Sequence, residues 1–327
     1  MLSTAVLFAS ADALTPIGNK PLAAHAVDDL VGAGVEEVIV ISPPAVAEDV
    51  RAVLAGRPAA RRAATGVIES EEGFVGGLRR VAPAIGERSF LVHLGTTLSR
   101  GGLRPALEDA VSGYDALALA ENVDDGVTPL GAGVALGRAA GVYVFGPAVL
   151  EVEPRHGPRA GPVELEIAYA ADRLAEAGGA VEVRRAPTLW RYRDGADAML
   201  QANRFFLSGL PGDAPVARSD GTDVQGAVEL HPTAQLTSAV VRGPVIVGPN
   251  VRICDAYVGP YTSIGSDVVV ENAEVENSII LPSATIRHLG ARLEGSIVGR
   301  GAHVFRDFRL PRAFRMTVGD GAKIAIS

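Results

Sequence analysis

The sequence predicts an α/β domain with a Rossmann-like sheet, followed by a left-handed parallel β-helix. Over the first 210 residues, short apolar runs alternate with amphipathic stretches, which is typical of a parallel sheet covered by helices. Further along, aliphatic residues recur every 17 positions in three rows, which predicts a solenoid with three flat faces. We therefore divide the chain into an α/β domain at 1–210, a linker at 211–221, and a β-helix with a C-terminal tail at 222–327.

The α/β domain begins with four pairs of a strand and a helix. We expect these pairs at Thr4–Phe8 and Pro21–Val31, Glu37–Ile41 and Ala45–Leu54, Gly66–Glu69 and Gly73–Ala84, and Ser89–His93 and Leu103–Val111. A mixed α+β region follows, with strands at 116–120, 134–136, 142–145 and 180–185 and helices at 162–177 and 196–207. Ligands of such sheets bind beyond the carboxyl ends of the strands, so the loops after Phe8, Glu69 and His93 should form the site.

The β-helix is predicted from three rows of inward-facing aliphatic residues. The rows contain Leu230, Val247, Ile264, Leu281 and Val298; Val224, Val241, Val258 and Val275; and Leu236, Ile253 and Val270. Small or β-branched residues follow many of these positions four residues later, namely Ala234, Val251, Thr262, Val268 and Thr285. The pairs Gly243-Pro244, Gly248-Pro249 and Gly259-Pro260 supply corners. An irregular step at Arg287–Gly290 indicates a protruding loop.

Composition excludes several classes of protein. The chain is 48% hydrophobic and 21% charged, as in ordinary soluble proteins, and its net charge of −8 argues against nucleic-acid binding. Neither a signal peptide nor a membrane span is recognisable, so we expect a cytoplasmic protein. Cys254 is the only cysteine, and we expect it to be a buried packing thiol. We predict no metal site and no cofactor.

Several ordered segments carry a resemblance to one family. They are Pro16–Leu22 (similar to "PVANKPV"), Asp28–Val35 ("LEDLREAGI"), Gly141–Phe145 ("GVYLF"), Glu164–Ile167 ("ELEIT"), Gln201–Arg204 ("EANR") and the tail segments Pro311–Arg315 and Val318–Asp320. The interval from Gly73 to Gly95 also matches. On these segments the chain resembles the long sugar-1-phosphate nucleotidylyltransferases, especially the actinobacterial glucose-1-phosphate thymidylyltransferase type. The resemblance implies a nucleotidyltransferase-like α/β domain with a degenerate N-terminal active site.

The residues that the family uses for catalysis are largely missing. The family's glycine-rich loop, whose N–H groups cradle a triphosphate, is deleted between Phe8 and Pro16, and Asp12 stands where a cation is needed. Thr96 replaces the metal-binding carboxylate of "LGD". The second metal carboxylate, in "WKDTG", corresponds to Asp194 or, without a gap, to Tyr192, and "EKP" has no counterpart between 121 and 141.

A pocket can remain although its catalyst is lost. The resemblance places the residues of this vestigial cleft at Ser10, Gly73, Gly95, Thr96, Tyr143, Glu166, Trp190, Arg191 and Tyr192. Candidates for a different chemistry are Asp12, Glu69, His93 and Asp194. Simpler structural interpretations also exist for some of these residues. The carboxylates Glu69, Glu71 and Glu72 also favour the dipole of the following helix, and Glu166 also fits an exposed helix position.

Two further patterns have simple alternatives. Gly131-Ala132-Gly133 with Gly137 superficially resembles a dinucleotide loop, but its spacing is wrong and no helix follows. The histidines His231, His288 and His303 lie in the predicted β-helix, where a histidine base at a subunit seam competes with ordinary surface positions.

Three hypotheses about function follow. The first is a pseudoenzyme that acts as a regulatory or scaffold subunit, with an active paralogue as partner. The second is a repurposed enzyme of specialised metabolism that acts on a different small polar or sugar-like ligand. The third is a weak nucleotidylyltransferase. In each case the uncapped ends of a solenoid predict a homo-oligomer.

Overall fold

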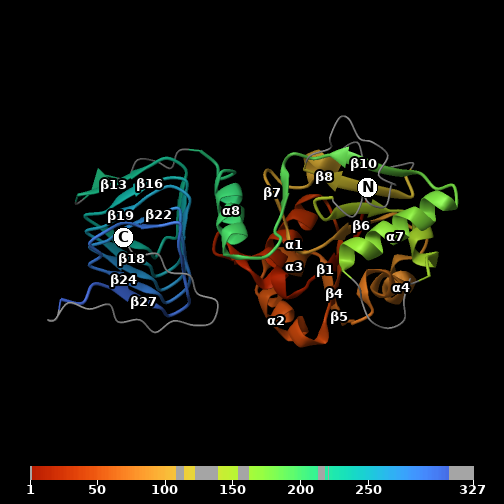
Figure 1. Cartoon of the computed structure of the whole chain (residues 1–327), viewed down its shortest axis with the longest axis horizontal. Coiled ribbons are helices and arrows are strands. Elements are labelled where there is room, and N and C mark those ends of the chain that lie inside the picture. The colour runs from red at the N-terminus through yellow and green to blue at the C-terminus, as the bar shows by residue number, and fades with distance from the viewer. Residues whose placement is uncertain are drawn as a thin grey trace.

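The protein consists of an α/β part and a solenoid that lie side by side, with helix α8 (Ala196–Leu207) between them (Figure 1). The computed structural model describes residues 2–107, 114–121, 139–153, 162–212, 218–219 and 221–308. The predicted strand at 134–136, the glycines at 131–137 and the tail segments Pro311–Arg315 and Val318–Asp320 lie outside these residues. Within them, no helix is long and apolar enough to cross a membrane.

A seven-stranded sheet forms the centre of the α/β part, in the order β10-β8-β9-β6-β1-β4-β5. Strand β9 pairs antiparallel with both of its neighbours, whereas the other pairings are parallel. Both faces of the central strands are covered, which explains why these strands read as continuous apolar runs. The strands are β1 (Thr4–Phe8), β4 (Glu37–Ser42), β5 (Ala64–Glu69), β6 (Phe90–His93), β8 (Ala116–Ala120), β9 (Val142–Phe145) and β10 (Val181–Arg185).

Helices cover both faces of this sheet, as the sequence predicts. One apolar core lies under α1 (Leu22–Gly32), α2 (Pro44–Ala55) and α3 (Pro58–Arg62), and the other lies under α4 (Gly73–Ile85) and α7 (Val163–Glu176). The helix predicted at 103–111 is present as α5 (Arg104–Leu107), and its later residues are not described. The shorter elements are η1 (Ala11–Leu14), η2 (Pro147–Glu151), β2 (Pro16–Ile17), β3 (Lys20–Pro21), β7 (Thr97–Ser99) and β11 (Leu189–Arg191).

Three parallel sheets form the faces of the solenoid, which confirms the predicted β-helix. The 17-residue rows are its rungs, because Val224, Val241 and Val258 pair in sequence along one face. The first face contains β13 (Thr222–Gln225), β16 (Val240–Arg242), β19 (Tyr257–Val258), β22 (Glu274–Glu276) and β25 (Leu293–Glu294), and β12 (Arg218–Ser219) pairs antiparallel with β13 at its edge. The second contains β14 (Val228–Leu230), β17 (Val245–Val247), β20 (Thr262–Ile264), β23 (Ile279–Ile280) and β26 (Ile297–Val298). The third contains β15 (Gln235–Thr237), β18 (Arg252–Cys254), β21 (Val269–Glu271), β24 (Thr285–Arg287) and β27 (His303–Phe305).

One row of the predicted lattice needs a correction. Ile264 pairs with Ile280 and not with Leu281, so this coil is one residue shorter than the lattice assumes. The small residue four positions later shifts in the same way, because Ala284 is fully buried while Thr285 is only half-buried. Extra residues then follow β24, since Val275 pairs with Leu293 one rung further on. This is the place where the sequence indicates an irregular step.

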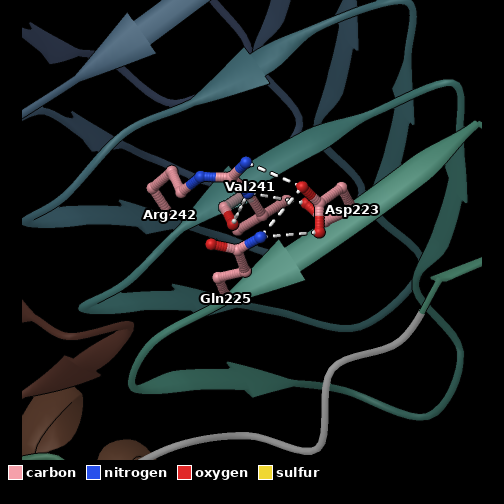
Figure 2. Close-up of polar contacts among 4 residues, drawn as sticks. All are labelled: Asp223, Gln225, Val241 and Arg242. Carbon is pink, nitrogen blue, oxygen red and sulfur yellow. Dashed lines mark hydrogen bonds and ion pairs between the residues drawn. The ribbon is translucent and has the colours of Figure 1, made fainter.

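Polar side chains tie the first coils together on the outer surface. Arg242 donates from Nη2 to the Oδ2 atom of Asp223 at 2.8 Å, and Gln225 donates from Nε2 to both carboxylate oxygens of Asp223 (Figure 2). Cys254 is also on the outside rather than in the packed interior. It is half-buried beside the inward-facing Ile253, and its thiol donates to Asp255, so the expectation of a buried packing thiol is wrong.

Helix α8 and the β2–β3 turn join the two parts through polar contacts. The amide of Asn203 accepts from the N–H of Gly18 and donates to the carbonyl of Tyr261 on the solenoid. Asn19, at the tip of the β2–β3 turn, donates to the carbonyl of Ile264. These contacts connect the segment that follows the first strand directly to the β-helix. The domain boundaries at 210 and 222 stay predictions.

Candidate functional site

A pocket of about 820 Å³ opens at the carboxyl ends of strands β1, β4 and β6. Its walls come from the loops after these strands, from the beginnings of α4 and α7, and from the segment after β11. Ligands of such folds bind at the carboxyl ends of the strands, and the volume of the pocket is ordinary for a small-molecule site. Of the predicted site residues, the pocket is lined by Ser10, Asp12, Gly73, Thr96, Arg191 and Tyr192.

The loop after β1 brings Ser10 and Asp12 into the pocket. Ala9 is buried, and its N–H donates to the carbonyl of Ile41, which extends the β1–β4 pairing by one residue. The chain then turns through η1, with Ala13 packed into the core. Because Ala9 and Ala13 hold this short connection against the sheet, the carboxylate of Asp12 lies on the exposed side, at the pocket rim.

Thr96 and Tyr192 are neighbours in the pocket wall. The N–H of Tyr192 donates to the carbonyl of Thr96 at 2.8 Å, beside the antiparallel pairing of β7 with β11. Gly95 allows this approach, because its φ is +70° and a Cβ there would lie 2.6 Å from the carbonyl oxygen of Phe8. The structure thus brings together the "LGD" position and the gap-free "WKDTG" position. Neither Thr96 nor Tyr192 carries a carboxylate.

Asp194, the other choice for the second position, does not line the pocket. Its side chain is exposed and accepts from the N–H of Gly195 at 2.6 Å, and its φ is +77°. The Tyr192 side chain is buried, and burial is the main cause that raises the pKa of its phenol, while a hydrogen bond with Thr15 acts in the opposite direction. Tyr192 therefore presents a neutral hydroxyl at neutral pH.

Arg191 forms the polar floor of the pocket. Its Nη2 atom lies 2.7 Å from Oε1 of Glu164, and only 9% of the Arg191 side chain is exposed. The Nε and Nη1 atoms are buried and have no hydrogen-bond partner among the described residues. Buried donors without acceptors are rare in folded proteins, and they are often found where a ligand or an ordered water belongs.

His93 and Tyr143 lie behind this floor and do not line the pocket. His93 is fully buried, and burial together with the charge of Arg191 lowers its pKa to about 3. Its Nδ1 atom accepts from the N–H of Gly95 at 2.9 Å. A neutral ring that accepts at Nδ1 carries its proton on Nε2, and that buried Nε2 has no partner among the described residues. Burial raises the pKa of Tyr143.

Glu166 has a role that fits neither of the two sequence-based readings. Its Oε2 atom accepts from the N–H groups of Phe74 at 2.6 Å and Val75 at 3.1 Å, in the first turn of α4. A Cβ on Gly73 would lie 2.3 Å from Oε1 of Glu166, so this contact needs the glycine. Glu166 therefore occupies the anion-binding end of α4 with the chain's own carboxylate.

The two remaining predicted residues point elsewhere. Glu69 pairs with Arg51 at 2.7 Å on the surface, and Trp190 stacks on Phe205 with ring centroids 6.1 Å apart. The solenoid histidines are not buried: His231 contacts Thr233 and His288 contacts Asn272, while His303 is exposed. Among the described residues, no three His, Cys, Asp or Glu side chains form a group that could hold a metal ion.

Sequence reasoning missed several lining residues. They are Phe8, Ala9, Ile41, Pro43, Ser70, Phe74, Leu94, Val163, Glu164 and Arg193. Glu164 belongs to the matched "ELEIT" segment, but the resemblance singled out Glu166, half a helical turn later. Most of the others follow directly from the rule that strand ends form the site. Arg193 had no signal of its own.

Comparisons with known proteins identify curated proteins of similar sequence. No protein-family model matches the chain. The chain is 28% identical over 340 residues to a glucose-1-phosphate thymidylyltransferase of Streptomyces griseus, covering 97% of this chain and 94% of that one. It is 29% identical over 338 residues to the low-salt glycan biosynthesis nucleotidyltransferase Agl11 of Haloferax volcanii, covering 96% and 93%. A crystal structure of a putative glucose-1-phosphate thymidylyltransferase from Bacillus anthracis, in complex with a sucrose, has a TM-score of 0.49 and 18% identity and covers 62% of this chain and 94% of that one.

The two curated relatives match the chain from end to end, and both are nucleotidyltransferases by name. Over nearly its whole length, the chain is therefore similar to proteins named as a glucose-1-phosphate thymidylyltransferase and a glycan biosynthesis nucleotidyltransferase.

Proposed function

We propose that this protein has lost nucleotidyl transfer and acts as a pseudoenzyme, a ligand-binding regulatory or scaffold subunit built on the nucleotidylyltransferase fold. One observation carries the proposal. The short connection from Phe8 to Pro16 places the carboxylate of Asp12 at the pocket rim, on the side where the resemblance puts the triphosphate cradle. A carboxylate there repels a polyphosphate, and no run of glycines offers N–H groups to it.

The neighbouring positions support the same conclusion. Thr96 and Tyr192 adjoin each other in the pocket, where the resemblance implies two carboxylates that hold Mg²⁺. A neutral hydroxyl binds Mg²⁺ far more weakly than a carboxylate does. Each lost electrostatic contact is worth about 3 kcal/mol in a transition state, so losing several would slow transfer by more than ~10⁶-fold.

The test is release of pyrophosphate by the purified full-length chain. The chain is incubated with Mg²⁺, glucose 1-phosphate and each nucleoside triphosphate in turn, and the Streptomyces griseus thymidylyltransferase is assayed in parallel. We expect no release above the background without enzyme. Sustained turnover with any nucleotide would contradict the proposal and would favour a weak transferase instead.

A repurposed enzyme is the second candidate, and the intact pocket favours it. A cavity of about 820 Å³ remains, with unpaired side chains of Asp12, Glu71 and Arg193 at its walls among the described residues. Turnover of a small polar substrate of specialised metabolism would distinguish this enzyme from a binding subunit. In either role we propose that the protein is cytoplasmic and forms a homo-oligomer. Light scattering would give the oligomeric state. Co-purification of an active paralogue would identify the regulatory role.

A further inference from the structure

The charges that line the pocket favour a cation over an anion. Three carboxylates (Asp12, Glu71 and Glu164) face two guanidinium groups (Arg191 and Arg193), so the wall carries one net negative charge. The opposite charges of Arg191 and Glu164 already compensate each other in their ion pair. The carboxylates of Asp12 and Glu71 have no ion-pair partner among the described residues and are exposed to the pocket.

The helix end that could attract a phosphate is already occupied. Helix α4 begins at the pocket with Gly73 and Phe74, and its first N–H groups would normally form an anion site. Here the carboxylate of Glu166 accepts from Phe74 and Val75. A phosphate at this place would have to displace that carboxylate, so Glu166 competes with any anion for the beginning of α4.

The floor and the walls define the rest of the ligand. The Nε and Nη1 groups of Arg191 are buried donors without acceptors among the described residues, so the floor favours a ligand with hydroxyl or carbonyl oxygens. Apolar side chains form the sides, including Phe8 and Phe74, whose ring centroids are 5.1 Å apart. Such surfaces pack against the C–H faces of a saturated ring.

We propose that the pocket binds a small polyhydroxylated ring compound that carries a protonated amine and no phosphate. Its hydroxyl oxygens face the Arg191 floor, its ring packs against the apolar side of the pocket, and its ammonium group lies near Asp12 and Glu71. The inference rests on the proposed loss of nucleotidyl transfer and names the ligand class of the same site.

Calorimetry at pH 7 with three matched probes tests this directly. The probes are D-glucosamine, whose amine is largely protonated, D-glucose, and glucose 1-phosphate. We expect glucosamine to bind about three- to tenfold more tightly than glucose, because a partly exposed ion pair adds a modest contribution. Glucose 1-phosphate should bind most weakly. Glucose or glucose 1-phosphate binding as tightly as glucosamine, or no binding of glucosamine at millimolar concentration, would overturn the proposal.

A matched pair of variants assigns the effect to the pocket. Asp12→Asn should reduce the preference for glucosamine over glucose, because of the two carboxylates near the ammonium group only Glu71 then remains, and it should change glucose binding much less. Asp194→Asn removes an exposed carboxylate outside the pocket and should leave the preference intact. If both variants reduce the preference, or neither does, the assignment to Asp12 fails. Pyrophosphate release would refute the proposed function, whereas tight glucose 1-phosphate binding without release would refute this inference alone.

Discussion

The interior of the β-helix and the floor of the pocket are both buried, yet they are built from opposite kinds of side chain. The solenoid interior is a stack of aliphatic residues such as Val241, Val258 and Ile253, and the backbone hydrogen bonds of its strands are made between successive coils. The pocket floor buries the guanidinium of Arg191, and the imidazole of His93 lies behind it; both have buried donors that lack acceptors among the described residues. The aliphatic interior of the solenoid stabilises the fold. The pocket floor retains buried polar groups that cost stability, and a ligand would supply the acceptors that they lack.

The largest expected difference between the two regions is their response to acid. The α/β part buries His25 and His93, and burial, reinforced by the nearby charges of Lys20 and Arg191 respectively, lowers the pKa of each to about 3. Within residues 221–308 no histidine is buried. An unfolded histidine takes up a proton near pH 6.5, so the unfolded state binds more protons than the folded state between pH 6.5 and 3. The free energy of unfolding therefore decreases as the pH is lowered through that window.

Two histidines together should lower the free energy of unfolding of the α/β part by about 3–4 kcal/mol between pH 7 and pH 5. Asp29 acts in the opposite direction, because burial raises its pKa to about 6, so its protonation stabilises the folded state as the pH falls. The measurement is therefore made on Asp29→Asn by urea unfolding, with the fluorescence of the single tryptophan, Trp190, as the probe. His25→Gln in the same background should halve the loss. A flat pH profile would contradict the burial of neutral histidines.

The next largest effect concerns packing inside the β-helix. Ile253 is 1% exposed and pairs with Leu236 and Val270 on adjacent coils. Ile253→Ala should cost about 3 kcal/mol, because it removes buried methyl groups and leaves a cavity. Arg252→Ala changes the exposed neighbour and should stay within about 0.5 kcal/mol. Urea midpoints followed by circular dichroism give both values. Equal effects of the two variants would mean that the rung is not packed as described.

The same contrast explains how far the sequence alone reaches. A solenoid repeats one local rule, so the rows through Val241 and Ile253 could be predicted from spacing. In the remaining row only Leu281 was wrong: a fixed 17-residue lattice does not allow for a coil that is one residue shorter, and the structure has Ile280 in the interior. Periodicity predicts which residues face inward only while every coil keeps its length.

The pocket has no such repeat, and prediction there depended on strand ends and on the family resemblance. These rules located Ser10, Asp12, Thr96 and Arg191 at the pocket. They could not show that Glu166 turns away to the N-terminus of α4 while Glu164 faces the cavity, because both residues lie in the first turn of one helix. Likewise His93 ends its strand at the site, but its side chain lies behind the floor. Side-chain direction at a helix start or strand end depends on tertiary contacts that spacing does not contain.

A smaller effect should come from the helix end beside the pocket. Glu166→Ala removes the carboxylate that accepts from Phe74 and Val75, and the loss of such a cap costs about 1 kcal/mol. Glu176→Ala, at the exposed opposite end of α7, should have almost no effect on stability. Glu166→Ala should also weaken the exclusion of anions from the pocket, because the N–H groups of Phe74 and Val75 lose their acceptor. Thermal unfolding with and without inorganic phosphate measures the loss of stability and the binding of the anion. If phosphate does not stabilise Glu166→Ala more than the unchanged protein, a group other than Glu166 repels the anion.

The smallest effect on stability should accompany the largest effect on binding, at Arg191. Removing one partner of a fully buried ion pair usually costs 3–5 kcal/mol. Glu164, however, keeps 36% of its side chain exposed and can be rehydrated, and Arg191→Met also removes two donors that have no acceptor among the described residues. The change in unfolding free energy should therefore stay within about 1 kcal/mol, while calorimetry should no longer detect glucosamine. Arg51→Met, which breaks a surface pair with Glu69, is the control for both measurements. If Arg191→Met unfolds the protein while Arg51→Met does not, Arg191 stabilises the fold, as the aliphatic residues of the solenoid interior do. The pocket floor would then not differ from the solenoid interior in its contribution to stability.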